Sequence, residues 1–324
     1  MRRTIRPILA IASTTARELA GQPAIMLLVL AGMLLTAFVP LLHFHDFGEP
    51  GRICRDGGLA YQLVIGTLVA VASTAASIHG ELANGTALAA LGKPVSRGAF
   101  LVGKWLGAFA VVARFWFCVL ASSLVAWRVP QRFTDFGDEG MGYVVDSAAQ
   151  CALLLLPAAA LAVGGFLHNR LRRRFCPTVL ATATWLSAAL LAACVLFDRQ
   201  WRLAPAAANI DAAAVPAALL VLFALAANSA FAAALSTRLP AAPVLVASLL
   251  LVAAGLSWDS ITAAAPPLAL LPVPNLQSFW MCDALAGGGA LPRGYLPVAL
   301  AYTLASVAVA LGAGILLFRG RDLS

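Results

Sequence analysis

The chain has 324 residues, of which 61% are hydrophobic and only 11% are charged, and its mean hydropathy is +0.89. A soluble protein keeps about a quarter of its residues charged, so this composition excludes a soluble domain. The net charge is +8, but the arginines stand between apolar runs and form no basic cluster with aromatic residues, so we expect no nucleic-acid partner. The long Leu-, Ala- and Val-rich runs favour membrane helices over a barrel.

The amino-terminal stretch, residues 2–20, has a basic start followed by a short apolar run. It could be mistaken for a signal peptide, but the run ILAIASTTA is followed by Arg17 and Glu18 and by no clean cleavage site, so we expect it to be retained. With four arginines among Ile and Leu, it is typical of an amphipathic helix lying on the membrane surface.

A spanning helix needs about 20 apolar residues, and eight segments meet that requirement. The predicted fold is therefore an all-α polytopic membrane protein with a single transmembrane domain over 1–324. The apolar segment 264–276 is broken by four prolines, so we expect 264–293 to be an extracytoplasmic or re-entrant segment. The predicted spans are 22–43, 58–80, 104–127, 144–167, 176–197, 213–236, 243–263 and 294–318.

Eight spans place both termini on one side of the membrane. That side carries 14 of the 22 basic residues but only three of the 14 acidic ones. Because basic residues accumulate in cytoplasmic loops, both termini are expected in the cytoplasm.

The octet GAFLVGKW, residues 98–105, has the G-x-x-x-x-G-K spacing of a phosphate-binding loop. Trp105 stands where a Ser or Thr would help to bind Mg²⁺, no strand precedes the octet, and a spanning helix follows it, so nucleotide binding is not expected. Gly98 and Gly103 instead allow the close approach of another segment.

The residues around this octet predict a structured cytoplasmic turn. Pro94 ends the preceding helix, and Ser96 can cap the next one. Lys93, Arg97 and Lys104 are expected at the level of the cytoplasmic lipid headgroups. A structured cytoplasmic hairpin suits contact with a soluble partner, although an ordinary anchored loop explains these residues equally well.

Arg114 and Asn228 are polar residues near the middle of predicted spans. Arg114 lies near mid-membrane, about 15 Å along its helix from Lys104. A charge there needs a partner, a cavity or an interface, so Arg114 is a candidate for translocation or for a structural bond. For Asn228, a helix–helix hydrogen bond is the favoured interpretation.

Metal and disulfide signals are weak. His43 and His45 lie just outside the first span near two acids, but two histidines without a third ligand are more typical of a loop than of a metal site. Cys54 and Cys282 are both expected on the outer side, where a disulfide is an open alternative.

The stretch ELANGTALAALGKPVSRGAFLVGKWLG, residues 81–107, resembles the first cytoplasmic loop of the ABC-2-type permeases, such as the permease of the nitrous-oxide-reductase maturation system. Residues 227–251, with their L-S-T-R-L turn, and residues 274–302, with P-N…F…D-A-L…Y, are similar to further family patterns. The terminal LLFRGRDL and the Arg-Glu-Leu at 17–19 also fit, so the similar segments run from end to end in family order.

The resemblance implies a permease subunit of the inner membrane that dimerises and binds separate ABC ATPase subunits. ATP and Mg²⁺ would be held by that partner, and this chain, which is not itself an enzyme, would bind no cofactor. Residues 2–20 would form the elbow helix, 81–104 would carry the coupling helix, and the carried-over coupling residues are Glu81, Thr86, Lys93, Pro94, Ser96, Arg97 and Lys104.

The family core has six spans, so 144–197 is expected to be an inserted helix pair. The expected function is export or mechanical work on a periplasmic partner, driven by the ATPase. Two alternatives stay open: a scaffold that anchors an ATPase without transport, and an ion-coupled carrier, which the lack of acids inside the spans disfavours.

Overall fold

The structure, a computed structural model, describes residues 2–42, 51–84, 96–130, 132–135, 141–200, 202–205, 209–267 and 273–319. Five residues singled out from the sequence lie outside these ranges, namely His43, His45, Thr86, Lys93 and Pro94. The helices are α1 (Arg2–Ala20), α2 (Pro23–Phe38), α3 (Arg52–Thr74), α4 (Gly80–Ala83), α6 (Arg97–Arg128), α7 (Ser147–Leu171), α8 (Phe175–Leu196), α10 (Ala214–Leu235), α11 (Ala241–Leu256), α12 (Trp258–Ala264) and α13 (Tyr295–Arg319). Shorter elements are η1 (Val39–Leu41), η2 (Ala75–His79), η5 (Gln277–Phe279), η6 (Asp283–Gly288), β1 (Arg132–Asp135) and β2 (Met141–Val144).

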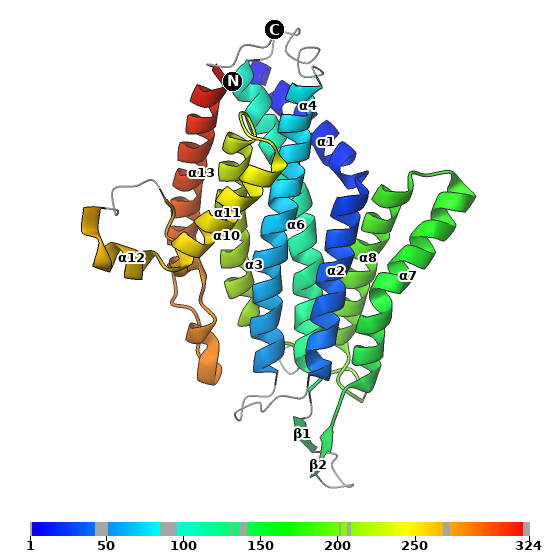
Figure 1. Ribbon diagram of the computed structural model, residues 1–324. Helices are drawn as coiled ribbons and strands as arrows, with labels where there is room; N and C mark the ends of the chain where they lie inside the picture. The colour runs from blue at the N-terminus through cyan, green and yellow to red at the C-terminus, as the bar shows by residue number, and fades with distance from the viewer. Residues whose placement is uncertain are drawn as a thin grey trace.

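The described residues form a bundle of long helices, which confirms the all-α polytopic membrane fold (Figure 1). Helices α3, α6 and α10 make the centre, and their facing side chains, such as Val69, Phe115 and Leu225, are almost fully buried. The α7–α8 hairpin covers one flank, and α11, α12 and α13 lie on the other (Figure 1). Helix α1 begins and α13 ends at the same end of the bundle, which we call the basic end because Arg97, Arg238 and the α7–α8 turn lie there.

Two of the spans are longer than the sequence suggested. Helix α3 continues through the π-helical segment η2 into α4, so that one helical run extends over Arg52–Ala83, and α6 extends over Arg97–Arg128. Each has 32 residues, or about 48 Å of helix, which exceeds a hydrocarbon core of about 30 Å. Both helices therefore project beyond the membrane core.

The predicted span 243–263 is not one straight helix. Helices α11 and α12 meet at Ser257 with a bend of 74°, so the described residues contain seven helices that could each cross a membrane, or eight if the bent pair is counted as one span. The 16 residues of α11 reach only about 24 Å, less than the thickness of the hydrocarbon core.

A tertiary contact holds the end of α11 at this bend. The Leu276 amide donates a hydrogen bond to the Gly255 carbonyl oxygen at 2.9 Å. A Cβ at Gly255 would lie 2.6 Å from the Leu276 side chain, so only glycine admits this approach. The segment after α12 thus returns to the bundle and packs against the end of α11.

A short antiparallel hairpin, β1–β2, joins α6 to α7, with Arg132 opposite Val144 and Asp135 opposite Met141. It lies at the end of the bundle opposite the start of α6 (Figure 1). The sequence analysis did not predict it, because four-residue strands leave almost no periodic signal.

Candidate coupling site at the basic end of the bundle

The two ends of the segment 81–104 meet in one cluster of charged side chains. The Lys104 ammonium on α6 forms an ion pair with the Glu81 carboxylate on α4, and its Nζ lies 3.9 Å from Oε2 of Glu18 on α1. The same Nζ lies 5.7 Å from the centre of the Phe100 ring. One lysine therefore connects three helices.

Lys104 is only 5% exposed, so other side chains of the protein surround it. A lysine removed from water needs a compensating anion, and Glu81 and Glu18 supply two carboxylates within reach of it. The sequence placed Lys104 by its position at a helix end and did not reveal these partners. Glu18 was missed as a site residue altogether.

Helix α1 packs along the first turns of α6 by means of two glycines. A Cβ at Gly103 would lie 2.8 Å from the Ile11 side chain, and one at Gly107 would lie 2.7 Å from the Ala12 carbonyl oxygen and 2.6 Å from Thr15. The spacing Gly103-x-x-x-Gly107 is the small-residue pattern that lets membrane helices approach closely. The sequence analysis identified Gly103 as a site of close approach but not its pairing with Gly107.

The predicted elbow segment is therefore a helix with the expected bounds, docked on α6. Glu18 comes from the same helix as Ile11 and Thr15, so the glycine contacts bring its carboxylate within reach of Lys104. This arrangement fixes α1, α6 and α4 to one another at the point where the segment 81–104 begins and ends.

Ser96 and Arg97 organise the start of α6. The Ser96 Oγ accepts a hydrogen bond from the Ala99 amide at 3.1 Å, which confirms the predicted helix cap. The Arg97 guanidinium donates to the carbonyl oxygens of Phe318 and Arg319, at 2.8 and 2.9 Å, and stacks over the Phe318 ring. Arg97 thus satisfies the last carbonyls of α13, a use of arginine that sequence alone does not reveal.

A second arginine reaches the same helix end. Arg238, in the turn between α10 and α11, donates to the Leu317 carbonyl oxygen at 2.7 Å. Trp105 on α6 donates a hydrogen bond from its indole Nε1 to the Ser229 hydroxyl on α10 at 3.0 Å. The start of α6 is therefore tied to α10 and α13 as well as to α1 and α4.

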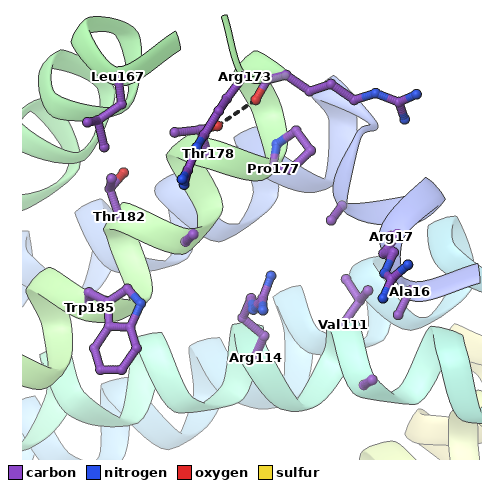
Figure 2. Close-up of a pocket in the computed structure, with 14 residues that line it drawn as sticks. Ala16, Arg17, Val111, Arg114, Leu167, Arg173, Pro177, Thr178, Thr182 and Trp185 are labelled. Carbon is purple, nitrogen blue, oxygen red and sulfur yellow. Dashed lines mark hydrogen bonds between the residues drawn. The ribbon is translucent and has the colours of Figure 1, made fainter. Parts of the chain in front are cut away.

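The two midspan polar residues have different surroundings. Asn228 is buried and donates from Nδ2 to the Thr67 hydroxyl on α3 at 3.3 Å, which is the helix–helix contact favoured from the sequence. Arg114 is exposed on the flank of α6 and lines a pocket there together with Arg17 and Arg173 (Figure 2). The structure does not bring Arg114 together with the Lys104 cluster.

The opposite end of the bundle is held by buried ion pairs. Arg128 is 2% exposed, forms an ion pair with Asp146, and donates to the carbonyl oxygens of Cys194 and Asp198, at 2.8 and 2.6 Å. Cys54 and Cys282 are both buried as free thiols and do not form a disulfide with each other. Within the described residues, no group of three or more His, Cys, Asp or Glu side chains is placed to hold a metal ion.

Comparison with known proteins identifies one family. The sequence profile described as "ABC-2 family transporter protein" matches residues 35–323, which is most of the chain. Neither a curated protein nor a solved structure gives a significant match.

Proposed function

The chain belongs to the ABC-2 transporter family and so is a transmembrane subunit of an ABC transporter, and we propose that it converts ATP hydrolysis by a separate ATPase into export or mechanical work. The family match carries this proposal, since it covers residues 35–323 and so includes the whole segment 81–104. Members of the family are membrane components and not nucleotide-binding subunits, and membership implies an ABC ATPase partner.

The cluster around Lys104 supports a coupling role for the segment 81–104. Force applied to that segment would reach α4 through Glu81 and α6 through Arg97, and the Lys104 ion pairs would carry it on to α1. Because a buried ion pair resists separation, a displacement of one helix moves the others with it. We therefore assign Lys93, Pro94 and Thr86 to contact with the ATPase, and Glu81 and Lys104 to transmission.

The remaining parts of the assembly follow from the same proposal. ATP and Mg²⁺ are held by the ATPase, and two permease copies form the membrane unit. The complex resides in a bacterial inner membrane with both termini in the cytoplasm. The segment 264–293 faces the other side, where it selects the substrate or contacts a periplasmic partner.

The test uses the full-length chain co-expressed with a stand-alone ABC ATPase and purified as a complex. We expect Lys93→Ala to abolish co-purification of the ATPase. Lys104→Met should leave co-purification intact but uncouple ATP hydrolysis from transport in vesicles. Arg170→Gln in the last turn of α7 removes the same charge at the same end of the bundle and should change neither co-purification nor coupling.

Different outcomes would favour the rival functions. A complex that binds the ATPase but shows the same ATP hydrolysis and the same solute distribution with and without the permease would support a scaffold. Solute movement by the purified chain alone, driven by an ion gradient, would overturn the proposal in favour of a carrier.

A further inference from the structure

A pocket of about 660 Å³ opens on the flank of the bundle where α1, α6 and the α7–α8 hairpin meet. Four arginines line it: Arg17 from α1, Arg114 from α6, and Arg173 and Arg174 from the turn before α8. Figure 2 shows Arg114 rising from α6 into the hollow, with Arg17 and Arg173 on its rim. No Asp or Glu is among the described residues that line it.

The four guanidinium groups have no anion of their own. None of them makes a hydrogen bond or ion pair with any residue that the structure describes. The buried Arg128, in contrast, is paired with Asp146. Glu18, which follows Arg17 on α1, lies within reach of Lys104, with its Oε2 3.9 Å from the ammonium.

The hydroxyl groups of the pocket are already committed to the backbone. Thr178 donates to the Arg174 carbonyl oxygen at 2.7 Å (Figure 2). Thr182 donates to the Val179 carbonyl oxygen at 2.8 Å. The groups that can bind a ligand are therefore the arginines. Guanidinium groups bind phosphate through paired N–H donors, and several like charges facing one cavity favour an anion between them.

The rest of the lining is apolar and faces outward from the bundle. Leu167, Pro177 and Ala181 form the wall on the hairpin side, and Trp185, which is 75% exposed, lies beside them. Arg114 lies about 15 Å along α6 from Lys104, so the pocket runs from the basic end toward the middle of the bilayer. A charge at that depth is costly without a counter-ion, and an amphiphile can bring one there while its chains cover the apolar wall.

We propose that this pocket binds the phosphate of an anionic phospholipid, which enters sideways from the cytoplasmic leaflet. Arg114 and Arg173 hold the phosphate, and the acyl chains lie along the Trp185 face of α8. Basic pockets between membrane helices on the cytoplasmic side are suited to such headgroups. The bound lipid offsets part of the positive charge of the pocket and joins the α7–α8 hairpin to α1 and α6.

Native mass spectrometry of the purified full-length chain tests this, with phosphatidylglycerol as the probe and phosphatidylethanolamine of the same acyl chains as the zwitterionic reference. We expect the wild type to retain phosphatidylglycerol selectively. Arg114→Gln should weaken its binding roughly tenfold, since one charge-assisted pair is lost. Arg172→Gln removes an equal charge from the α7–α8 turn that carries Arg173 and Arg174, but from outside the pocket, and should leave binding unchanged.

A second variant separates pocket binding from loss of fold. Ala181→Trp keeps all four arginines but places a large side chain in the pocket, where the lipid would lie. This variant should therefore also lose the lipid while eluting as a folded protein in gel filtration. Equal retention of phosphatidylglycerol by the wild type, Arg114→Gln and Ala181→Trp would overturn the proposal. Competition by inorganic phosphate as effective as that by the lipid would assign the pocket to a soluble anion and would also overturn it. So would cross-links showing that a second copy of the chain covers Trp185.

Discussion

The docking of α1 on α6 leads to a sharp prediction for Gly107→Ala. The added methyl group would stand 2.7 Å from the Ala12 carbonyl oxygen, whereas ordinary contacts begin at 3.4 Å, so α1 has to move outward by about 0.7 Å. The obstructing atom belongs to the backbone and cannot rotate away. Such overpacking costs about 1–3 kcal/mol, against which the better helix propensity of alanine returns up to about 1 kcal/mol.

Gly312→Ala on α13 is the matched control, because nothing lies within 4 Å of a Cβ at that position. It gains the same helix propensity without a clash, so the difference between the two variants isolates the packing term of about 1–3 kcal/mol. In thermal unfolding in detergent, the melting temperature of Gly107→Ala should be lower than or equal to that of the wild type. The melting temperature of Gly312→Ala should be equal to or higher than that of the wild type. Limited trypsin digestion should cut α1 faster in Gly107→Ala alone. If Gly107→Ala were as stable as Gly312→Ala and equally resistant to trypsin, the packing of α1 on α6 would be wrong.

Three further outcomes are expected. Lys104→Met should lower stability by about 2 kcal/mol, because it removes the ammonium that pairs with the three-quarters-buried Glu81 carboxylate, and adding Glu81→Gln should recover most of that loss in thermal unfolding. Arg128→Met should lower the free energy of unfolding by about 3–5 kcal/mol and reduce the yield of folded protein in gel filtration. The double variant with Asp146→Asn, which retains the helix cap, should lose less stability than Arg128→Met alone. Equal yields of folded protein from the single and the double variant would contradict the buried pair. Burial and the nearby Asp56 raise the pKa of Cys282 from 9.0 to about 12, so its thiol stays protonated at pH 8 and should react with maleimide only after unfolding; rapid labelling of the folded protein would refute this.

Composition and apolar run length were sufficient to predict most of the spans. Helices α7, α8 and α10 begin and end within a few residues of the predicted 144–167, 176–197 and 213–236. The reason is physical: a helix in lipid must satisfy its own backbone, so a sufficient apolar run is nearly enough to specify it. The helix cap at Ser96 could also be predicted from the sequence, because it depends on a local hydrogen bond.

The bend between α11 and α12 could not be found in this way. The run 243–263 has enough apolar residues for one span although Ser257, Asp259 and Ser260 interrupt it, and at the break Leu276 from a later segment packs against Gly255. Hydropathy over a window contains no information about such a contact.

The sequence by itself determined the class of protein, the approximate number of spans and the charge asymmetry from which their orientation is predicted, because each depends on single residues or on local runs. The tertiary structure alone decided the partners of the charges. It buried Lys104 between Glu81 and Glu18, placed Arg97 on the last carbonyls of α13, and left Arg114 facing an arginine-lined pocket. The energy of an ion pair depends on the distance between the two charges and on how deeply they are buried. For residues far apart in the chain, only the folded bundle sets those two quantities.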